Sequence, residues 1–363
     1  MTTSNRWSRL AVAASAAAAA ALTAAPVSAA EEIRLTMVSG YPPAATWTGA
    51  VVDTFEPKVD AQLAKTGKYK IIWNNAHSGQ VVKPRGEIEA VQGGVADISP
   101  VPTVFHFDRV PLYAMPYHTP FTTNDVGLLA NVLGKMERDY ADDYNTVWAA
   151  LNQVNLIVTS NVDDYILFST KPLKTLADLR GMKVGAAGAN IPWITPTGAA
   201  GVQTNLADGY NSLQTGIYQV NMSWWQAGGS FKLCEPAPHV LVVGFGANSV
   251  VNLTVNGDVW KKLPAEVKQA LQDNAPAYNA RNIELVLNGA KTGRERCVKD
   301  YKTTVAELTK DEMRQWAKSL PPLALQWAED AEKKGYPARK MLTAYMDQMR
   351  AAKQPVFRNW DKE

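Results

Sequence analysis

The stretch EIRLTMVSGYPP, residues 32–43, opens the pattern that decides the fold of this chain. Its first seven residues alternate between polar and apolar side chains, which is typical of a β-strand, and a Ser-Gly-Tyr-Pro-Pro segment then breaks the strand. Apolar residues at helical spacing follow over residues 46–63, and KYKIIWN, residues 68–74, is a second alternating strand. A helix over residues 85–92 and a short buried strand at 96–98 complete a β-α-β-α-β order. Strands that alternate with helices predict an α/β fold with a mostly parallel sheet.

The loops that follow these strands are the first candidates for a binding site. Ligands of open α/β sheets bind at the carboxyl ends of the strands. We therefore expect one side of a cleft to be lined by residues 39–46, 74–84 and 99–105.

A second α/β unit follows in the sequence. We expect it to begin with a strand at residues 156–160. The further elements that the pattern predicts are a strand at 165–169, a helical turn and strand over 176–184, a helix at 207–217 and a strand at 219–222.

The carboxyl-terminal third crosses between the two units. Residues 240–255 are rich in β-formers and can cross back to the first unit, and residues 264–299 form a long helix. Two more helices, at 312–333 and 339–352, carry Trp316, Trp327, Tyr345 and Met346 inward. No Ser/Gly-rich linker separates the halves, so we expect two α/β lobes joined by several chain crossings.

The amino terminus predicts export. Residues 1–9 carry Arg6 and Arg9 without an acidic residue, residues 10–25 are almost all alanine with Val and Leu, and Pro-Val-Ser-Ala-Ala at 26–30 is a small-x-small cleavage site. We expect a signal peptide over residues 1–30 and a periplasmic protein. A retained membrane anchor is the alternative, but the apolar run of about 16 residues is short of the ~20 that span a bilayer.

Charge and cysteine content narrow the function further. Without Arg6 and Arg9 the chain has 35 basic against 34 acidic residues, so there is no electrostatic signal for a nucleic-acid partner. Cys234 and Cys297 are the only cysteines. An oxidising compartment permits a disulfide between them, and two buried free thiols are the equal alternative.

Motifs of catalysis and cofactor binding are missing from the sequence. The four histidines have no i,i+4 ligand spacing, and there is neither a Cys-x-x-Cys pair nor a Gly-x-Ser-x-Gly turn. Residues 185–189, GAAGA, lack the full glycine pattern of a dinucleotide loop. We expect no metal, no cofactor and no enzymatic activity, although a catalytic triad assembled in space leaves no such pattern.

Aromatic residues are the strongest candidates for ligand contact. Tyr41 lies in the first post-strand loop, Trp193 in the loop after residue 185, and Trp224 with Trp225 after the strand at 219–222. Successive side chains of a strand point apart, so one of Trp224 and Trp225 is free to line a cleft. Large rings offer stacking faces and attract cations, but for any single tryptophan packing in the core is the commoner role.

Four segments resemble the solute-binding proteins of TRAP (tripartite ATP-independent periplasmic) transporters, of the C4-dicarboxylate-binding type. LKTLADLRGMKV at 173–184 is similar to the family's L-x-D-L-K-G-(M/L)-K signature. The other three, in the family's order, are QGGVADI at 92–98, YNSLQTG at 210–216 and WKKLPAEV at 260–267.

The resemblance implies a two-lobed periplasmic-binding-protein (Venus flytrap) fold with hinge strands and a long connecting helix. We place lobe I at residues 31–162 and 250–290, and lobe II at 163–249 and 291–363. The family captures a small-molecule solute between the lobes and delivers it, without catalysis, to the TRAP membrane permease subunits, driven by an ion gradient. We also expect a monomer. The binding protein of an ATP-driven uptake system is the rival interpretation.

The sequence departs from the family where the ligand is held. Family members carry an arginine directly after the G-(M/L)-K-hydrophobic segment, which grips a carboxylate, and here that position is Gly185. A second usual arginine aligns near Tyr165, beside Asp163 and Asp164. A carboxylate without a cationic partner is costly to bury, so we expect a cationic, zwitterionic or aromatic solute held by ring faces and hydrogen bonds.

The alternative is that these acids are solvated and that Arg85 or Arg109 binds an anion from the other lobe. The predicted ligand-binding residues are Tyr41, Asp164, Tyr165, Gly185, Trp193, Ser223, Trp224 and Trp225.

Overall fold

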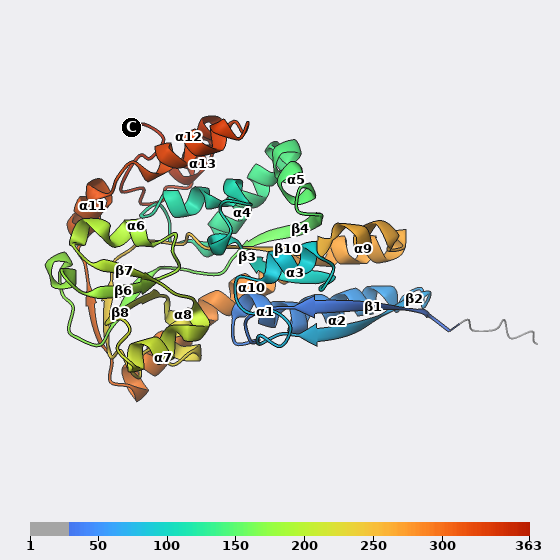
Figure 1. Cartoon of the computed structure of the whole chain (residues 1–363), viewed down its shortest axis with the longest axis horizontal. Helices are drawn as coiled ribbons and strands as arrows, with labels where there is room; N and C mark the ends of the chain where they lie inside the picture. The colour runs from blue at the N-terminus through green and yellow to red at the C-terminus, as the bar shows by residue number, and fades with distance from the viewer. Residues whose placement is uncertain (1–28) are drawn as a thin grey trace, which may run out of the picture.

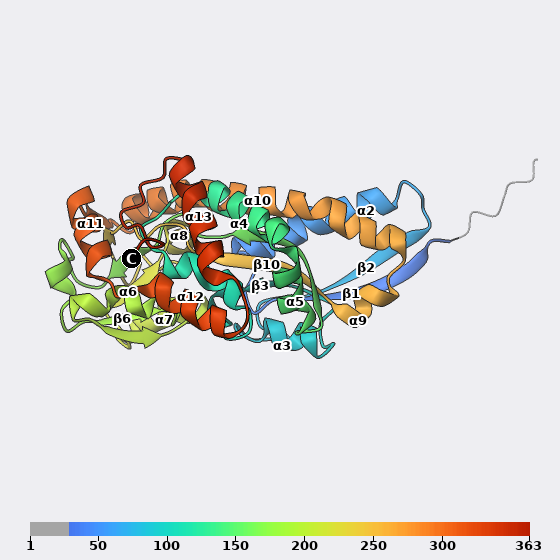
Figure 2. The same ribbon diagram turned by 90° about the horizontal axis from the view of Figure 1, so that it is seen from above.

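Two β-sheets form the framework of the protein, and one long helix runs beside both of them (Figures 1 and 2). The computed structural model describes residues 29–363. The predicted signal peptide lies outside the described residues except for Ala29 and Ala30. Within the described residues, no helix combines the length and the apolar character that a membrane crossing requires.

The first sheet contains the strands of the opening pattern. Its order is β2-β1-β3-β10-β4, and β1 pairs in parallel with both β2 and β3. The strands are β1 (Glu31–Val38), β2 (Tyr69–Ala76), β3 (Ile98–Pro102), β4 (Gln153–Ser160) and β10 (Val250–Asn256). The predicted order of three strands and two helices is confirmed: the helices are α1 (Thr46–Ala50), a π-helical turn (Val51–Phe55), α2 (Glu56–Leu63) and α3 (Glu87–Gln92).

The second sheet is six-stranded, with the order β11-β9-β5-β8-β6-β7. Strands β8, β6 and β7 pair in parallel at one edge and β11 pairs in parallel with β9 at the other, while β5 between them runs antiparallel to β8 and β9. The strands are β5 (Ile166–Ser169), β6 (Lys183–Ala186), β7 (Ala200–Gln203), β8 (Val220–Ser223), β9 (His239–Val242) and β11 (Thr304–Glu307). The predicted α/β class with mostly parallel sheets is confirmed.

The turn inside the LADL motif is held by a capping box. A short 3-10 helix, Leu176–Leu179, begins after Thr175, and the Asp178 carboxylate accepts backbone hydrogen bonds from Thr175 and Lys174, both at 2.8 Å. The Asp178 side chain thus stabilises the first turn of this helix, and the turn sets the direction in which the chain enters β6. The helix predicted at 207–217 is shorter, with a 3-10 turn at Leu206–Asp208 and α7 at Gly209–Gln214.

Strand β4 lies in the first sheet. The order of elements along the chain made residues 156–160 the start of the second unit, whereas the lobe bounds put them in lobe I with residues 250–290; β4 pairs antiparallel with β10 from Gln153–Asn256 to Ser160–Val250 and so belongs to the first sheet. The β-rich segment at 240–255 does cross between the units, since β9 lies in the second sheet and β10 in the first.

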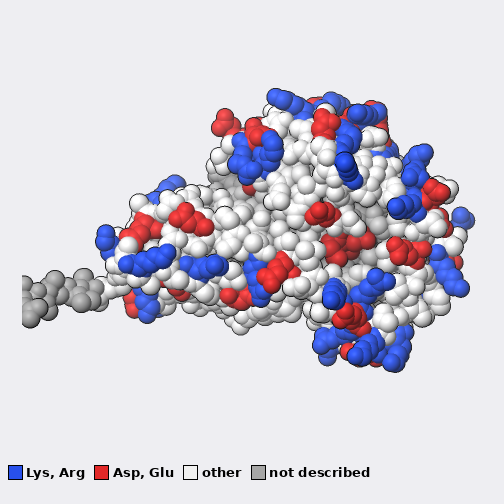
Figure 3. Space-filling view, turned by 180° about the vertical axis from the view of Figure 1, so that it is seen from behind, with Lys and Arg blue, Asp and Glu red and all other residues white. Residues whose placement is uncertain are grey.

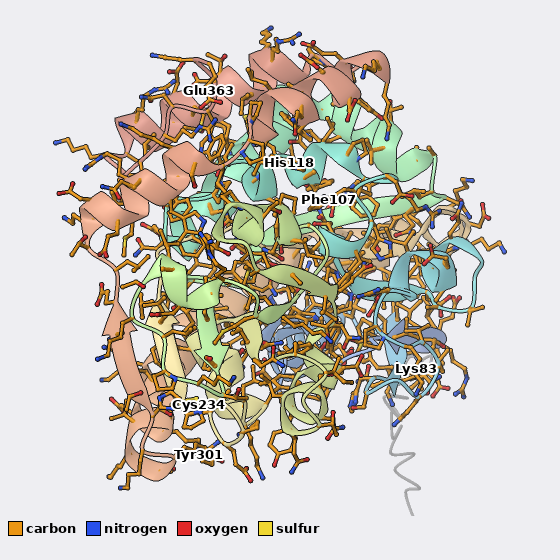
Figure 4. The ribbon with its side chains drawn as sticks, turned by 60° about the vertical axis from the view of Figure 1, so that its left-hand side comes forward. Lys83, Phe107, His118, Cys234, Tyr301 and Glu363 are labelled. Atoms are coloured by element: carbon orange, nitrogen blue, oxygen red, sulfur yellow. A yellow bond between two sulfur atoms is a disulfide. The ribbon has the colours of Figure 1, made fainter. Side chains whose placement is uncertain are left out.

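Helix α10 (Ala265–Asp300) confirms the predicted long helix and packs against elements of both sheets. It contacts α1, α2 and β4 on the side of the first sheet, and α8 (Trp225–Ser230) on the side of the second. The approach to α8 requires glycine: a Cβ on Gly293 would lie 2.1 Å from the carbonyl oxygen of Trp225. Cys234 and Cys297, both fully buried, form a disulfide that joins the segment after α8 to α10, and Figure 4 shows Cys234 on the same side of the molecule as Tyr301.

The carboxyl-terminal helices cover the segment between β3 and β4. The helix predicted at 312–333 is two helices, α11 (Lys310–Ser319) and α12 (Leu323–Lys333), because Pro321 and Pro322 cannot continue a helix. Trp327 of α12 donates its indole hydrogen to the carbonyl of Pro111 at 2.8 Å, and α13 (Ala338–Ala351) packs on α4 (Val126–Asp139). The inward positions predicted for Trp316, Trp327, Tyr345 and Met346 are confirmed by their burial.

Candidate functional site

A cavity lies between the two sheets, where the carboxyl ends of several strands meet. It has an empty volume of about 500 Å³, counting its open mouth. The first-sheet side is formed by residues after β1, β3 and β4, and the second-sheet side by residues after β6, β7 and β8. Its lining residues are Tyr41, Trp47, Pro102, Val104, Phe105, Asn161, Tyr165, Ala187, Thr204, Asn205, Leu206, Asn221, Met222, Ser223, Trp224 and Ser249.

Aromatic rings from both sheets meet in this cavity. The Tyr41 ring lies 5.1 Å from that of Trp47, edge to face, and the Trp47 ring lies 6.5 Å from that of Trp224. Tyr165 contacts Trp224 edge to face at 5.9 Å. Such a group of rings offers flat apolar surface to a bound solute.

Several polar atoms of the lining have no partner. The indole nitrogen of Trp47, Oδ1 of Asn161 and Oγ of Ser223 are buried without a hydrogen bond in the described residues. A buried polar group without a partner costs free energy, so these three atoms are available to a ligand.

The lining of the cavity is uncharged. No Asp, Glu, Lys, Arg, His or Cys is among its lining residues in the described chain. The hydroxyl of Tyr165 shares a 2.9 Å hydrogen bond with that of Tyr117. Burial raises the pKa of Tyr165 to about 12, and burial also raises the pKa of Tyr41 well above its usual value. Both phenols therefore remain neutral hydrogen-bonding groups at physiological pH.

A family model matches most of the chain. Residues 41–330 match the bacterial extracellular solute-binding protein family 7, also called DctP. The chain belongs to this family.

Solved structures of other solute-binding proteins share the fold. A TRAP solute-binding protein from Rhodoferax ferrireducens, in complex with copurified benzoate, has a TM-score of 0.76 at 17% identity over 88% of this chain and 98% of that one. A marine metagenome TRAP protein with 3-hydroxybenzoate has a TM-score of 0.75 at 20% identity over 89% and 99%. Another from a marine metagenome, with copurified pyroglutamate, has a TM-score of 0.73 at 19% identity over 88% and 99%.

In this family 7 protein, four of the eight predicted ligand-binding residues line the cavity. Tyr41, Tyr165, Ser223 and Trp224 all do so, and they come from both sides of it. Ligand contact by these four stays a prediction. The other four, Asp164, Gly185, Trp193 and Trp225, are not among the lining residues.

Gly185 lies under an aromatic ring. It sits in β6, and a Cβ built on it would lie 2.5 Å from ring atoms of Tyr218. Tyr218 is fully buried and its hydroxyl accepts a 3.0 Å hydrogen bond from Asn221. The space beside position 185 is therefore occupied by a phenol, which leaves no room for an arginine side chain.

The two remaining tryptophans pack away from the cavity. Trp193 is fully buried, stacks on Tyr117 at 5.9 Å and donates its indole hydrogen to the Tyr117 carbonyl. Trp225 contacts Phe168, and the guanidinium of Arg294 lies 5.6 Å from its ring on the side of α10. Trp224 and Trp225 thus point apart, as the geometry of successive residues predicts.

Asp164 points into a different hollow. Its carboxylate accepts a 2.8 Å hydrogen bond from the backbone of Gly246, and it lines a separate groove with Glu307 and Met313 at the carboxyl ends of β9 and β11. A role for Asp164 in charge recognition inside the cavity is not supported by this placement.

The burial of Asp164 gives a testable pH dependence. Desolvation raises its pKa to about 8, with the nearby Asp163 and Glu307 adding to the effect. An acid whose pKa is higher in the folded state stabilises the fold at low pH, and this stability is lost as pH rises from about 4 to about 8. Asp164→Asn keeps the oxygen that accepts from Gly246, so the variant should gain up to a few kcal/mol relative to the wild type between pH 5 and pH 8.

Urea unfolding at both pH values measures this change. Asp311→Asn removes an exposed carboxylate on α11 and should follow the wild-type pH dependence. A pH dependence of Asp164→Asn equal to that of the wild type would show that Asp164 titrates normally in the folded protein.

Of the three loops expected to line the cleft, 39–46 and 99–105 contribute to the cavity, the latter through Pro102, Val104 and Phe105, while none of residues 74–84 is among its lining residues. Asn161 was not predicted as a ligand contact, although it directly follows the strand predicted at 156–160. Trp47 starts the first helix and follows the loop of Tyr41. Thr204 carried no signal, because the strand β7 that precedes it lacks apolar alternation, whereas Asn221 lies within the strand predicted at 219–222.

Proposed function

We propose that this protein is the extracytoplasmic solute receptor of a TRAP transporter, which captures a compact solute with a flat apolar body and delivers it unchanged to the membrane permease. The family membership and the fold shared with TRAP solute-binding proteins support the receptor role. Membership of an extracellular solute-binding family and the predicted signal peptide support binding in the periplasm.

The observation that carries the choice of solute is the uncharged, aromatic lining of the cavity. Five rings line it, those of Tyr41, Trp47, Phe105, Tyr165 and Trp224, and within residues 29–363 no charged side chain does so. The cavity would offer a purely cationic solute aromatic ring faces but no carboxylate to balance its charge, since Asp164 lines a different groove. An aromatic or ring-shaped solute fits best, and two of the similar structures hold benzoate and 3-hydroxybenzoate.

The charge pattern of the surface agrees with a receptor for small molecules. On the face shown in Figure 3, basic and acidic side chains are interspersed. Such a surface has no extended basic area of the kind that a nucleic-acid partner requires.

The first experiment identifies the solute directly. Protein purified from its periplasmic fraction is denatured, and the released small molecules are identified by mass spectrometry. Thermal melting against a panel of aromatic acids, zwitterions, amines and dicarboxylates then ranks the classes, because a ligand at 100 times its dissociation constant adds ~2.7 kcal/mol of stability. A panel without any stabilising solute contradicts the receptor role, and conversion of a bound solute into a product contradicts delivery without chemistry.

Trp224→Ala tests which residue provides the stacking surface. Removing this indole from the centre of the cavity should weaken solute binding by roughly 30-fold or more, as expected for a buried aromatic anchor. Isothermal titration with the solute that the panel identifies measures the loss. Trp260→Ala, which removes an indole from α9 (Gly257–Lys262) far from the cavity, is the matched control and should bind like the wild type. Equal affinities of Trp224→Ala and wild type would place the binding site elsewhere.

A further inference from the structure

One cation lies at the mouth of the uncharged cavity. Arg85 belongs to the loop between β2 and α3, two residues after Lys83, which Figure 4 labels. Its guanidinium donates a 3.0 Å hydrogen bond to the carbonyl of Thr204 and lies 4.8 Å from the centre of the Phe105 ring. Phe105 and Thr204 line opposite sides of the cavity, so the guanidinium bridges the two sheets where the solute would enter.

The charge of Arg85 has no carboxylate partner in the part of the chain that the structure describes. Among residues 29–363, no carboxylate oxygen lies within 4.0 Å of its guanidinium, and its Nε is buried without a hydrogen bond. Arg109, the other arginine considered as an anion ligand, is already used, because it pairs with Glu89 and hydrogen-bonds to Gln92. The guanidinium of Arg85 is therefore free to pair with an anion brought by a solute.

The backbone of Arg85 is held in a costly conformation. Its φ is +82°, in the left-handed region that residues other than glycine rarely adopt. The carboxylate of Glu87 holds this backbone in place: one of its oxygens accepts the N–H of Arg85 at 2.9 Å, and the other accepts the N–H of Gly40 at 3.1 Å. Glu87 is fully buried, so it ties the loop of Arg85 to the loop that carries Tyr41. Strain that the surrounding structure enforces in this way is typical of ligand-binding positions.

We propose that Arg85 provides the positive charge for the carboxylate of the bound solute, so that this receptor takes monocarboxylic acids whose ring lies among Tyr41, Trp47 and Trp224. The assignment rests on the proposed receptor function and names its class of solute. Arg85 replaces, from the first-sheet side, the guanidinium that position 185 does not supply. Its Nε and a terminal nitrogen form a two-donor edge that matches the two oxygens of a carboxylate.

The same geometry excludes dicarboxylates. One guanidinium balances one carboxylate, and no lysine or arginine of the described chain is among the lining residues of the cavity. The second carboxylate of a compound such as succinate would be buried between aromatic rings without a cation, which is costly. We therefore expect benzoate and 3-hydroxybenzoate to bind and succinate to be rejected.

An acid–amide comparison tests the proposal. Isothermal titration is carried out with benzoate and with benzamide, which share a ring and differ in charge. The wild type should prefer benzoate by roughly tenfold to a hundredfold, the range of a hydrogen-bonded charge pair. Arg85→Gln should abolish this preference by weakening benzoate selectively, and Arg85→Lys should retain part of it because the charge remains. Arg109→Gln, which removes a neighbouring arginine that is paired elsewhere, should keep the full preference.

Each other outcome overturns the assignment. If Arg85→Gln weakens the binding of benzoate and of benzamide by the same factor, the arginine only links the two sheets through Thr204 and does not bind the carboxylate. A wild type that binds benzamide as tightly as benzoate, or that binds succinate but neither aromatic acid, also contradicts it. Urea unfolding of both arginine variants confirms that they fold. The receptor function fails separately, only if no member of the wider solute panel binds.

Discussion

Gly185→Arg is expected to destabilise the protein by roughly 3 kcal/mol or more, although it installs the residue that the family resemblance places at this position. A Cβ on residue 185 already meets the buried ring of Tyr218 at 2.5 Å, and the remaining side chain has to displace that ring. The displacement also breaks the 3.0 Å hydrogen bond from Asn221 to the Tyr218 hydroxyl, beside the cavity. Urea unfolding measures the loss, and solute binding should fall with it.

Two companion variants separate the steric cause from the charge. Gly185→Ala adds only the Cβ and should cost about 1–3 kcal/mol. Gly185→Arg combined with Tyr218→Ala should be more stable than the sum of the two single changes predicts, because the small residue makes room for the arginine. A stable Gly185→Arg protein would mean that the Tyr218 ring moves aside easily, and that the lack of arginine at 185 does not define the site.

The local elements of this fold were predictable because their signals are local. The alternation in residues 32–38 and the helical spacing at 46–63 predicted β1 and the following helices within a few residues. Strand β4 shows the limit of the local pattern: its own residues identify it as a strand, but its sheet is decided by pairing with β10, which follows about 90 residues later, and only the lobe bounds drawn with the family resemblance put the two segments together. A pattern read along the chain contains no information on such a partner.

The candidate site was predictable to a similar degree. Tyr41 and Trp224 follow strands directly, and the rule that ligands bind at the carboxyl ends of strands placed both beside the cavity. Trp193 also follows a strand, yet Phe245 packs against its ring at 5.1 Å and Trp316 donates a hydrogen bond to its carbonyl. Those two residues come from distant segments, so the burial of Trp193 could not be inferred from its neighbours in the sequence.

The geometry around Arg85 distinguishes it from Arg109 as the candidate anion ligand. From the sequence, Arg85 and Arg109 were equivalent candidates for an anion partner. Only the fold shows that Arg109 is bound to Glu89, while Arg85 stays without a carboxylate beside two lining residues of the cavity.

Removal of the disulfide is the second change with a large expected effect. Replacing both Cys234 and Cys297 by alanine should lower the free energy of unfolding by about 4 kcal/mol, the chain-entropy value for a closed loop of this size. The bond joins residues 63 positions apart, and both cysteines are fully buried. The wild type should therefore keep the bond during unfolding experiments that contain no reductant. Urea unfolding of the double variant and of the wild type measures the difference.

Binding should respond differently from stability to this double change. Neither cysteine lines the cavity, and in the chain-entropy model the bond acts mainly by restricting the unfolded chain. The solute affinity of the folded double variant should therefore stay within about twofold of the wild type. This change is smaller than the loss of one hydrogen bond to the solute would cause. A large loss of affinity at unchanged stability would instead mean that the link between the segment after α8 and α10 sets the position of Trp224, since α8 begins at the next residue.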